Sequence, residues 1–221
     1  MILSKLQFIL KTLCQTYKYS VFLWRNFTPI DEMRKKVLQN PIRNKFCAAV
    51  ISNCASKFRL NFIKKLNKYK KIDMGGKCNN NIGGKVKNKI EFLTGYKFSI
   101  AMENSIGDGY ISEKLTHSFL AGTIPIYYGD YLIDEYINPK TYIFIKGEYD
   151  IKKKIEYIKK IDNDDELYRS IMKEKPVIDD NFINKIDNID IKLFLKNIFT
   201  QEKKKAYRRD NSFYDFKCKK N

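Results

Sequence analysis

A run of polar and small residues near the middle of the chain has the types and spacing to bind a phosphorylated ligand. Residues 98–114 read FSIAMENSIGDGYISEK, which is an apolar run followed by Glu103 and Asn104, two glycines and a helical pattern. Glycines let the backbone approach a ligand closely, and a helix start offers unpaired N–H groups and the positive end of the helix dipole. Lys114 opposes that dipole, so we expect it to face an anion, while Glu113 could accept hydrogen bonds from ribose or sugar hydroxyls. The same pattern also fits a plain strand–turn–helix with a surface lysine, and it is not a Walker motif.

Short apolar runs alternate with amphipathic segments around this turn. The pattern predicts strands at 46–52, 69–73, 97–102, 123–128 and 141–145, and helices at 56–68, 85–94, 110–121 and beyond 150. Such alternation is typical of parallel strands joined by right-handed crossovers. We therefore predict an α/β fold, a Rossmann-like parallel sheet with flanking helices, whose ligand lies at the carboxyl ends of the strands.

Several blocks in the same order resemble the α-1,3/4-fucosyltransferases, glycosyltransferase family ten. The blocks are FCAAVISN, YKKIDMGGKCNNNIG, KNKIEFLTGYKFSIAMENS, GYISEKL and AGTIPIYYG. The family signature is similar to F-E-N-[ST] followed by G-Y-V-T-E-K and a T-[IV]-P-[IV]-Y-[WY]-G strand. Here Ser112 stands where Thr is usual, and Tyr128 stands where Trp is common. The resemblance covers roughly residues 44–146 and implies the C-terminal, donor-binding half of a GT-B glycosyltransferase.

The resemblance also implies a role for particular residues. Arg59 and Lys114 match the basic pair that contacts the diphosphate of GDP-fucose, and Asn104, Tyr110 and Glu113 match positions that contact ribose or fucose. Glu103 lies in the same motif, where it either contacts the ligand or holds the turn.

The implied reaction is inverting transfer of fucose from GDP-fucose to a hydroxyl of an acceptor oligosaccharide or glycoconjugate, usually on N-acetylglucosamine or glucose. No cofactor or metal is required, although stimulation by a divalent ion is left open. The family's catalytic base belongs to an N-terminal acceptor domain, and we find no match to it, since Asp31 and Glu32 are the only acids before residue 44. Residues 1–43 are too few for that domain. We assign 44–200 to the GDP-sugar-binding domain and 201–221 to a basic tail. A split or truncated sugar-nucleotide-binding module without its own catalysis is the alternative.

The charge of the chain raises a different class of partner. The 221 residues carry 43 Lys and Arg against 25 Asp and Glu, a net charge of +18, but seven of the basic residues are Arg. Phosphate and nucleic-acid sites favour the bidentate Arg fork, so a lysine-rich excess is weaker support for a polyanion partner. A basic nucleic-acid-binding protein remains the competing hypothesis, without a nucleic-acid motif to support it.

Cysteine content and the N-terminus bear on location. The five cysteines are odd in number and fit no zinc pattern, which favours a reduced compartment. Residues 2–24 are apolar but interrupted by Lys5, Lys11 and Lys18, which argues against a signal peptide or a membrane span and favours a core-facing helix over a membrane-surface one. We expect a cytoplasmic protein, with peripheral membrane contact left open.

Three further features look functional but favour ordinary interpretations. The sequence Asp162-Asn163-Asp164 is a weak metal motif that we interpret as a charged loop between helices. His117, the only histidine, lies one helical turn after Glu113, where a structural or exposed role is more common than that of a base. Cys78 is interpreted as a small loop side chain rather than a reactive thiol.

Overall fold

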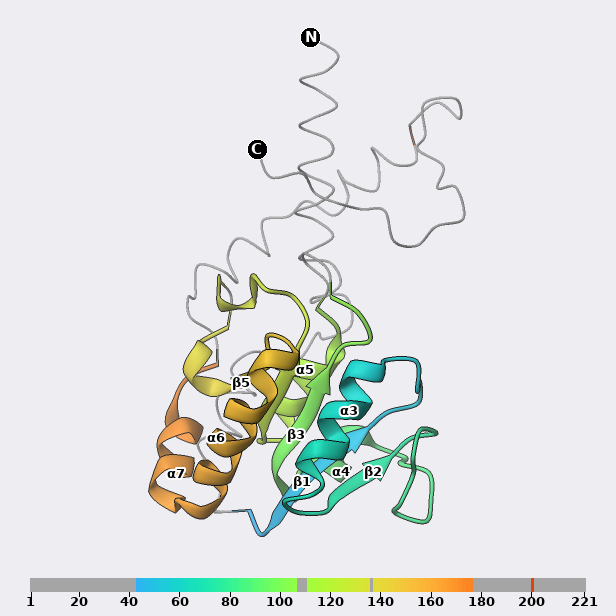
Figure 1. Ribbon diagram of the computed structural model, residues 1–221, viewed down its shortest axis with the longest axis horizontal. Helices are drawn as coiled ribbons and strands as arrows, with labels where there is room; N and C mark the ends of the chain where they lie inside the picture. Colours follow the sequence, from blue (N-terminus) through green and yellow to red (C-terminus); the bar gives the residue numbers. More distant parts are fainter. Residues whose placement is uncertain (1–42, 107–110, 136, 177–199, 201–221) are drawn as a thin grey trace.

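The computed structural model describes residues 43–106, 111–135, 137–176 and 200, and its centre is a five-stranded parallel sheet (Figure 1). The strands are β1 (Lys45–Val50), β2 (Ile72–Gly75), β3 (Tyr96–Met102), β4 (Ile124–Tyr128) and β5 (Ile143–Phe144). Their order across the sheet is β2-β1-β3-β4-β5, and every neighbouring pair is parallel. The predicted α/β fold, a Rossmann-like sheet with flanking helices, is confirmed.

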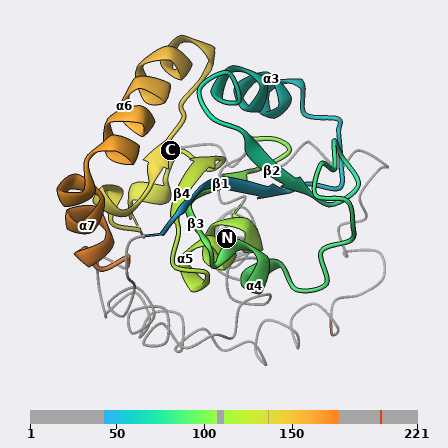
Figure 2. The same ribbon diagram turned by 90° about the horizontal axis from the view of Figure 1, so that it is seen from below.

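Helices cover both faces of this sheet (Figure 2). One face carries α3 (Lys57–Leu66), α6 (Ile151–Asn163) and α7 (Asp165–Lys173). The opposite face carries α4 (Lys89–Leu93) and α5 (Glu113–Leu120). Three short 3-10 helices lie around β5: η1 (Ile133–Glu135), η2 (Pro139–Thr141) and η3 (Glu148–Asp150).

Strand β3 is buried along its whole length, because helices pack on both of its faces. Phe98, Ile100 and Met102 face the core beneath α3 and α6, whereas Ala101 faces the core beneath α5. A parallel strand covered on both sides reads as a continuous apolar run rather than an alternation, as the FSIAM segment does. This strand delivers Glu103 and Asn104 to the carboxyl edge of the sheet.

The strand order places a topological switch point between β1 and β3. From β1 the chain crosses through α3 to β2 on one side, and then through α4 to β3 on the other. In open parallel sheets the crevice outside the carboxyl ends of the strands at such a point is the usual ligand site. The N-termini of α3, α4 and α5 lie at this same edge, since each helix runs back antiparallel to the strands.

The structure moves the starts of two predicted helices. The helix predicted from residue 110 begins at Glu113, because Ser112 adopts an extended backbone and its hydroxyl accepts a hydrogen bond from the Lys114 N–H. The helix predicted from residue 85 begins at Lys89, where Asn88 is the N-cap. The segments 2–24 and 201–221, with Asp31, Glu32, Gly107, Gly109 and Tyr110, lie outside the described residues.

The cysteines are a further correction. Cys54, in the loop after β1, forms a disulfide with Cys78, in the Gly/Asn-rich loop after β2. Cys78 is therefore not merely a small loop side chain, and its thiol is not available for reaction while the bond is intact. The two residues are 24 positions apart in sequence, and they meet because β1 and β2 are adjacent parallel strands whose following loops leave the same edge. The preference for a reduced compartment loses its support.

Candidate functional site

Glu103 is fully buried directly after β3, and it organises the turn that leads into α5. Its Oε1 accepts hydrogen bonds from the Ser112 N–H at 2.9 Å and from the Ser112 hydroxyl at 2.5 Å. Its Oε2 forms an ion pair with the Lys114 Nζ at 2.6 Å. The Glu103 N–H donates to the Tyr128 carbonyl at 2.7 Å, which joins the ends of β3 and β4. The structure thus gives Glu103 a role in holding the turn.

Lys114 completes this network from the first turn of α5. Its Nζ donates to the Ser112 hydroxyl at 2.8 Å as well as to Glu103, and its side chain is 20% exposed. A positively charged residue at the positive end of a helix is unfavourable, and here the buried carboxylate of Glu103 compensates it. Lys114 is thereby held at the rim of the carboxyl edge, with its side chain still partly exposed.

Arg59 spans the switch point itself. This side chain from the first turns of α3 is 2% exposed. Its Nη1 donates to the carbonyl of Met102 at the end of β3 at 3.0 Å, and its Nη2 donates to the carbonyl of Asn53 after β1 at 2.6 Å. Arg59 and Lys114 therefore approach successive residues of one strand end, Met102 and Glu103. The structure places both members of the predicted basic pair at the end of β3, and their contact with a ligand remains a prediction.

The other predicted residues surround this pair. Asn104 is exposed immediately after Glu103, and Glu113 is partly exposed at the first position of α5. Because both side chains emerge at the carboxyl edge, they are placed where a bound nucleotide could reach them. Tyr110 lies outside the described residues. A tilted ring pair between Phe58 and Tyr128, with centroids 4.2 Å apart, closes the edge on the side of α3.

Lys89 is a cation at this edge that sequence reasoning missed. It is the first residue of α4, which packs against α5, and it is partly buried. Burial lowers its pKa to about 8; the charge of Lys114 adds to this effect, and the charges of Glu113 and Glu103 oppose it. Its position could have been inferred from the fold pattern, since a lysine at the start of a crossover helix lies at the ligand edge.

His117 lies one turn along α5 and is half-buried. Burial is the main cause that lowers its pKa, and the neighbouring Lys89 charge adds to the effect. A neutral imidazole at pH 7 follows from both causes. His117 thus lies beside the site as a half-buried side chain of α5.

Asp162 and Asp164 have structural roles, the first as a buried, paired carboxylate and the second as a helix cap. Asp162 is 7% exposed in the last turn of α6, where it accepts hydrogen bonds from Tyr69 at 2.9 Å and Lys70 at 2.5 Å. Asp164 is the N-cap of α7 and accepts from the Leu167 N–H. The interpretation as a charged loop between helices is therefore wrong for Asp162, which is a buried, paired carboxylate of α6, whereas Asp164 does lie between α6 and α7. Within the described ranges, no group of three or more His, Cys, Asp and Glu side chains is placed to hold a metal.

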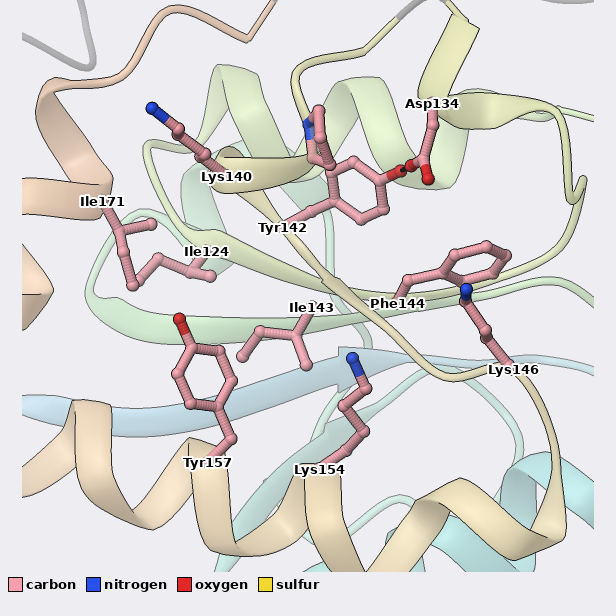
Figure 3. A pocket seen from close by; sticks show the side chains of 11 residues that line it. Ile124, Asp134, Lys140, Tyr142, Ile143, Phe144, Lys146, Lys154, Tyr157 and Ile171 are labelled. Atoms are coloured by element: carbon pink, nitrogen blue, oxygen red, sulfur yellow. Dashed lines mark hydrogen bonds between the residues drawn. The ribbon is translucent and has the colours of Figure 1, made fainter.

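A separate pocket of about 240 Å³ lies beside the edge strand β5 (Figure 3). Its floor is apolar and its rim includes three lysines, with Asp134 hydrogen-bonded to the Tyr142 hydroxyl. The lining residues are Ile124, Asp134, Pro139, Lys140, Tyr142, Ile143, Phe144, Lys146, Lys154, Tyr157 and Ile171. None of the predicted donor-site residues lines this pocket, so it is separate from the candidate donor site.

A parallel doubly wound sheet with cations and helix N-termini at its switch point is typical of domains of the Rossmann-like class. The model of the C-terminal region of glycosyltransferase family 10 (fucosyltransferase) matches residues 40–186, and the chain belongs to this family. The resemblance that the sequence motifs indicated is thereby confirmed.

Curated relatives are similar over the same region. An α-(1,3)-fucosyltransferase of Helicobacter pylori is 33% identical over 138 residues, which are 62% of this chain and 29% of that protein. A protein of Acanthamoeba polyphaga mimivirus named as a fucosyltransferase is 34% identical over 171 residues, 71% of this chain and 28% of that protein. The GDP-fucose protein O-fucosyltransferase 3 of Xenopus tropicalis is 30% identical over 128 residues, 53% of this chain and 27% of that protein.

Solved structures agree with the fold. The crystal structure of an α1,3-fucosyltransferase with GDP-fucose superposes with a TM-score of 0.60 at 28% identity, covering 72% of this chain and 54% of that one. The structure of an α1,3-fucosyltransferase with GDP gives a TM-score of 0.60 at 31% identity, covering 66% of this chain and 45% of that one. The chain thus spans about half the length of these neighbours and under a third of the first two curated relatives. In the part of the chain that the structure describes, none of the helices has the length and apolar character needed to cross a membrane.

Proposed function

We propose that this chain supplies the GDP-fucose-binding part of an inverting fucosyltransferase that acts on a hydroxyl of an acceptor glycan in α-1,3 linkage. The observation that carries the proposal is the convergence of Arg59 and Lys114 on the end of β3 at the switch point of the sheet. Membership of the fucosyltransferase family and the similarity to a structure with GDP-fucose support the choice of donor. We assign this role to residues 44–200.

In the proposed step, an acceptor oxygen attacks the anomeric carbon of fucose from the face opposite to the nucleotide. The new carbon–oxygen bond forms as the bond between that carbon and the β-phosphate oxygen breaks, so GDP leaves with the bonding electron pair. A general base takes the proton from the acceptor hydroxyl. Negative charge grows on the leaving diphosphate, and cations held in advance stabilise it.

The residues of this chain divide the work of binding. The guanidinium of Arg59 and the ammonium of Lys114 face the diphosphate, and Asn104, Tyr110 and Glu113 contact ribose or fucose. Glu103 and Ser112 hold Lys114 and the turn in place through the hydrogen bonds that they share. The network leaves the cations little reorganisation to undergo when the donor arrives.

The base and the acceptor site belong, in this proposal, to a region or a polypeptide beyond the described residues. The relatives include an α-(1,3)-fucosyltransferase and GDP-fucose protein O-fucosyltransferases, so sugar and protein acceptors both occur among them. We favour a sugar acceptor because the relatives named as α-(1,3)-fucosyltransferases match over longer stretches of the chain.

Isothermal titration calorimetry of the full chain with GDP, GDP-fucose, UDP and ADP tests the donor assignment. We expect GDP and GDP-fucose to bind, and UDP and ADP to bind at least about tenfold more weakly, because a site built to bond one base leaves its polar groups unpaired with another. Preference for UDP or ADP would overturn the assignment. The control is Lys153→Ala, which removes a positive charge at an exposed position of α6. It should bind GDP as the wild-type chain does if binding does not come from the general positive charge of the chain.

A further inference from the structure

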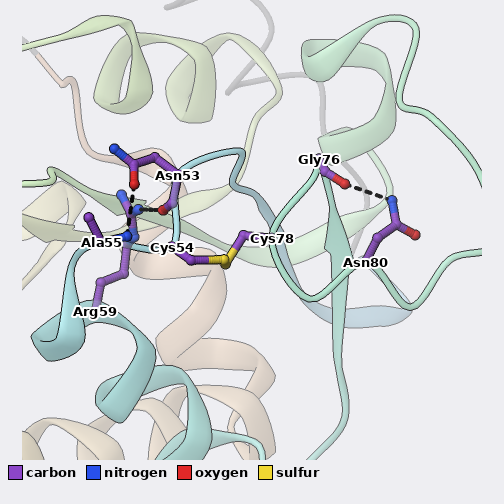
Figure 4. The surroundings of a disulfide bond; sticks show 7 residues. All are labelled: Asn53, Cys54, Ala55, Arg59, Gly76, Cys78 and Asn80. Atoms are coloured by element: carbon purple, nitrogen blue, oxygen red, sulfur yellow. Dashed lines mark hydrogen bonds between the residues drawn. A yellow bond between two sulfur atoms is a disulfide. The ribbon is translucent and has the colours of Figure 1, made fainter.

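The loop between β1 and α3, residues 51–56, carries one of the two carbonyls that hold Arg59. The Asn53 carbonyl accepts the Nη2 hydrogen bond at 2.6 Å, and the Asn53 side chain accepts from the Ala55 N–H at 2.8 Å (Figure 4). Residues 52–55 are exposed and form neither helix nor strand. The position of the guanidinium therefore depends on a short exposed segment with few contacts of its own.

The Gly/Asn-rich loop after β2 holds this segment from the other side. The Cys78 N–H donates to the Ile51 carbonyl at 2.9 Å, and Asn80 fixes its own loop by donating to the Gly76 carbonyl at 2.9 Å. Gly76 has a φ of +86°, and a Cβ there would lie 2.3 Å from the Ile51 carbonyl oxygen. Only glycine permits this close approach of the two loops.

The Cys54–Cys78 disulfide joins the two loops one residue after the Asn53 carbonyl (Figure 4). Cys78 is fully buried beneath its loop, whereas Cys54 is exposed. The buried partner anchors the bond in the core, and the exposed partner carries that anchorage into the segment that supports Arg59. The bond is also open to attack by a reductant at Cys54.

We propose that the Cys54–Cys78 disulfide positions Arg59 for the terminal phosphate of the donor nucleotide, so that the oxidised chain discriminates a nucleoside diphosphate from a monophosphate more strongly than the reduced chain. The proposal rests on the donor site described above. Cys54 and Cys78 act through the Asn53 carbonyl and touch no ligand, which makes them positioning residues. Their effect is confined to the phosphate that Arg59 faces, and the guanosine end of the ligand is held by other residues.

Calorimetry with GDP and with GMP on the full chain measures this discrimination. Three samples are compared: the oxidised chain, the chain treated with a phosphine reductant, and the Cys54→Ser/Cys78→Ser variant. The phosphine supplies two electrons to the disulfide and takes up an oxygen from water, while each sulfur gains a proton. Loss of disulfides is checked by thiol titration, and retention of the fold by circular dichroism.

We expect reduction to weaken GDP binding roughly tenfold, the loss expected when one hydrogen bond to a charged group is misplaced. GMP binding should stay within about twofold. The double Cys variant should resemble the reduced chain and should not respond to the phosphine. Arg59→Lys should lose the same discrimination in the oxidised state and should also be insensitive to reduction, which keeps the test decisive if the Cys variant folds poorly.

Equal weakening of GDP and GMP would reduce the disulfide to a general structural role and overturn the inference. Unchanged binding of both would overturn it as well. Neither outcome affects the proposed donor, whose own failure would appear as preference of the oxidised wild-type chain for UDP or ADP over GDP.

Discussion

A buried carboxylate paired with lysine lies at each end of strand β3, yet the two clusters differ in what surrounds them. At the carboxyl end, Glu103 pairs with Lys114 at the N-terminus of α5. At the amino end, Lys97 pairs with Asp162 at 3.6 Å and donates to the Asp162 carbonyl at 2.8 Å, in the last turn of α6. Both clusters pair a lysine with a carboxylate. They differ in lying at opposite ends of the strand.

The helix ends explain why only one cluster is suited to an anionic ligand. Asp162 lies at the negative end of a helix, where its carboxylate is unfavourable until lysines neutralise it, so the amino-end cluster balances itself. Glu103 lies beside the positive end of α5, with Arg59 and Lys89 on neighbouring elements. That edge has cationic character beyond the ion pair, which an incoming diphosphate can complement. Buried pairs of lysine and carboxylate thus indicate function only in combination with their place in the fold.

The largest expected effect comes from removing the cation at the carboxyl end. Lys114→Ala should lower turnover of GDP-fucose by roughly 10²–10³-fold, the usual result of removing one charged donor that stabilises a transition state. Steady-state kinetics with GDP-fucose and an acceptor, in the assembly that is active, measures this. The matched control is Lys97→Ala, which removes the paired lysine at the other end of β3. If this variant keeps its fold and loses as much turnover as Lys114→Ala, the distinction between the two clusters is refuted.

A paired substitution separates stability from binding. Glu103→Gln and Asp162→Asn each remove the charge from a buried, hydrogen-bonded carboxylate, and we expect each to lower the free energy of unfolding by about 2 kcal/mol. Only Glu103→Gln should also weaken GDP, because it releases Lys114. Urea denaturation and calorimetry measure the two effects, and weakened GDP binding in a folded Asp162→Asn chain would contradict the comparison.

The low pKa of Lys89 predicts a pH dependence specific to the carboxyl end. As pH rises through about 8 this ammonium loses its charge, so GDP affinity should fall several-fold between pH 7 and pH 9. In the unfolded chain the pKa of this lysine is about 10.4. Between about pH 8 and pH 10.4 the unfolded chain therefore binds more protons than the folded chain, and this group makes the free energy of unfolding rise with pH. Lys89→Met should abolish both trends. Titrations at pH 7, 8 and 9 test this, and a wild-type decline that persists in Lys89→Met would assign it to another group.

The smallest effect concerns His117. Because burial keeps its imidazole neutral, we expect His117→Gln to change turnover by less than about twofold and to leave the pH profile unaltered. Kinetics between pH 5 and pH 8 check this. A loss of turnover of more than tenfold would show that His117 contributes to the chemistry.

The sequence predicted the fold well because each strand is short, apolar and separated from the next by a helical pattern. It located Arg59, Glu103 and Lys114 through motif resemblance, and their mutual distances required the sheet order. Ser112 was treated as a small departure from the family, although its hydroxyl caps α5 and joins Glu103 to Lys114. A single side chain with three partners is not visible in a linear pattern.

Two features could not be predicted, because they depend on contacts between elements distant in sequence. The Cys54–Cys78 pair follows no spacing rule and arises from the adjacency of β1 and β2. The low pKa of Lys89 arises from the packing of α4 on α5. Asp162 was placed in a loop because Asp-Asn-Asp is polar, whereas tertiary pairing with Lys70 and Lys97 buries it in α6.

The most direct test of the account is the ³¹P NMR spectrum of GDP bound to the full chain. If Arg59 and Lys114 contact the diphosphate, the β-phosphate resonance should shift on binding. The shift should largely disappear in both Arg59→Lys and Lys114→Met, while the guanosine protons still report a bound base. A β-phosphate resonance that is unmoved in the wild-type complex, or that shifts as far in both variants as it does in the wild-type chain, would contradict the assignment of the carboxyl end of β3 as the donor site.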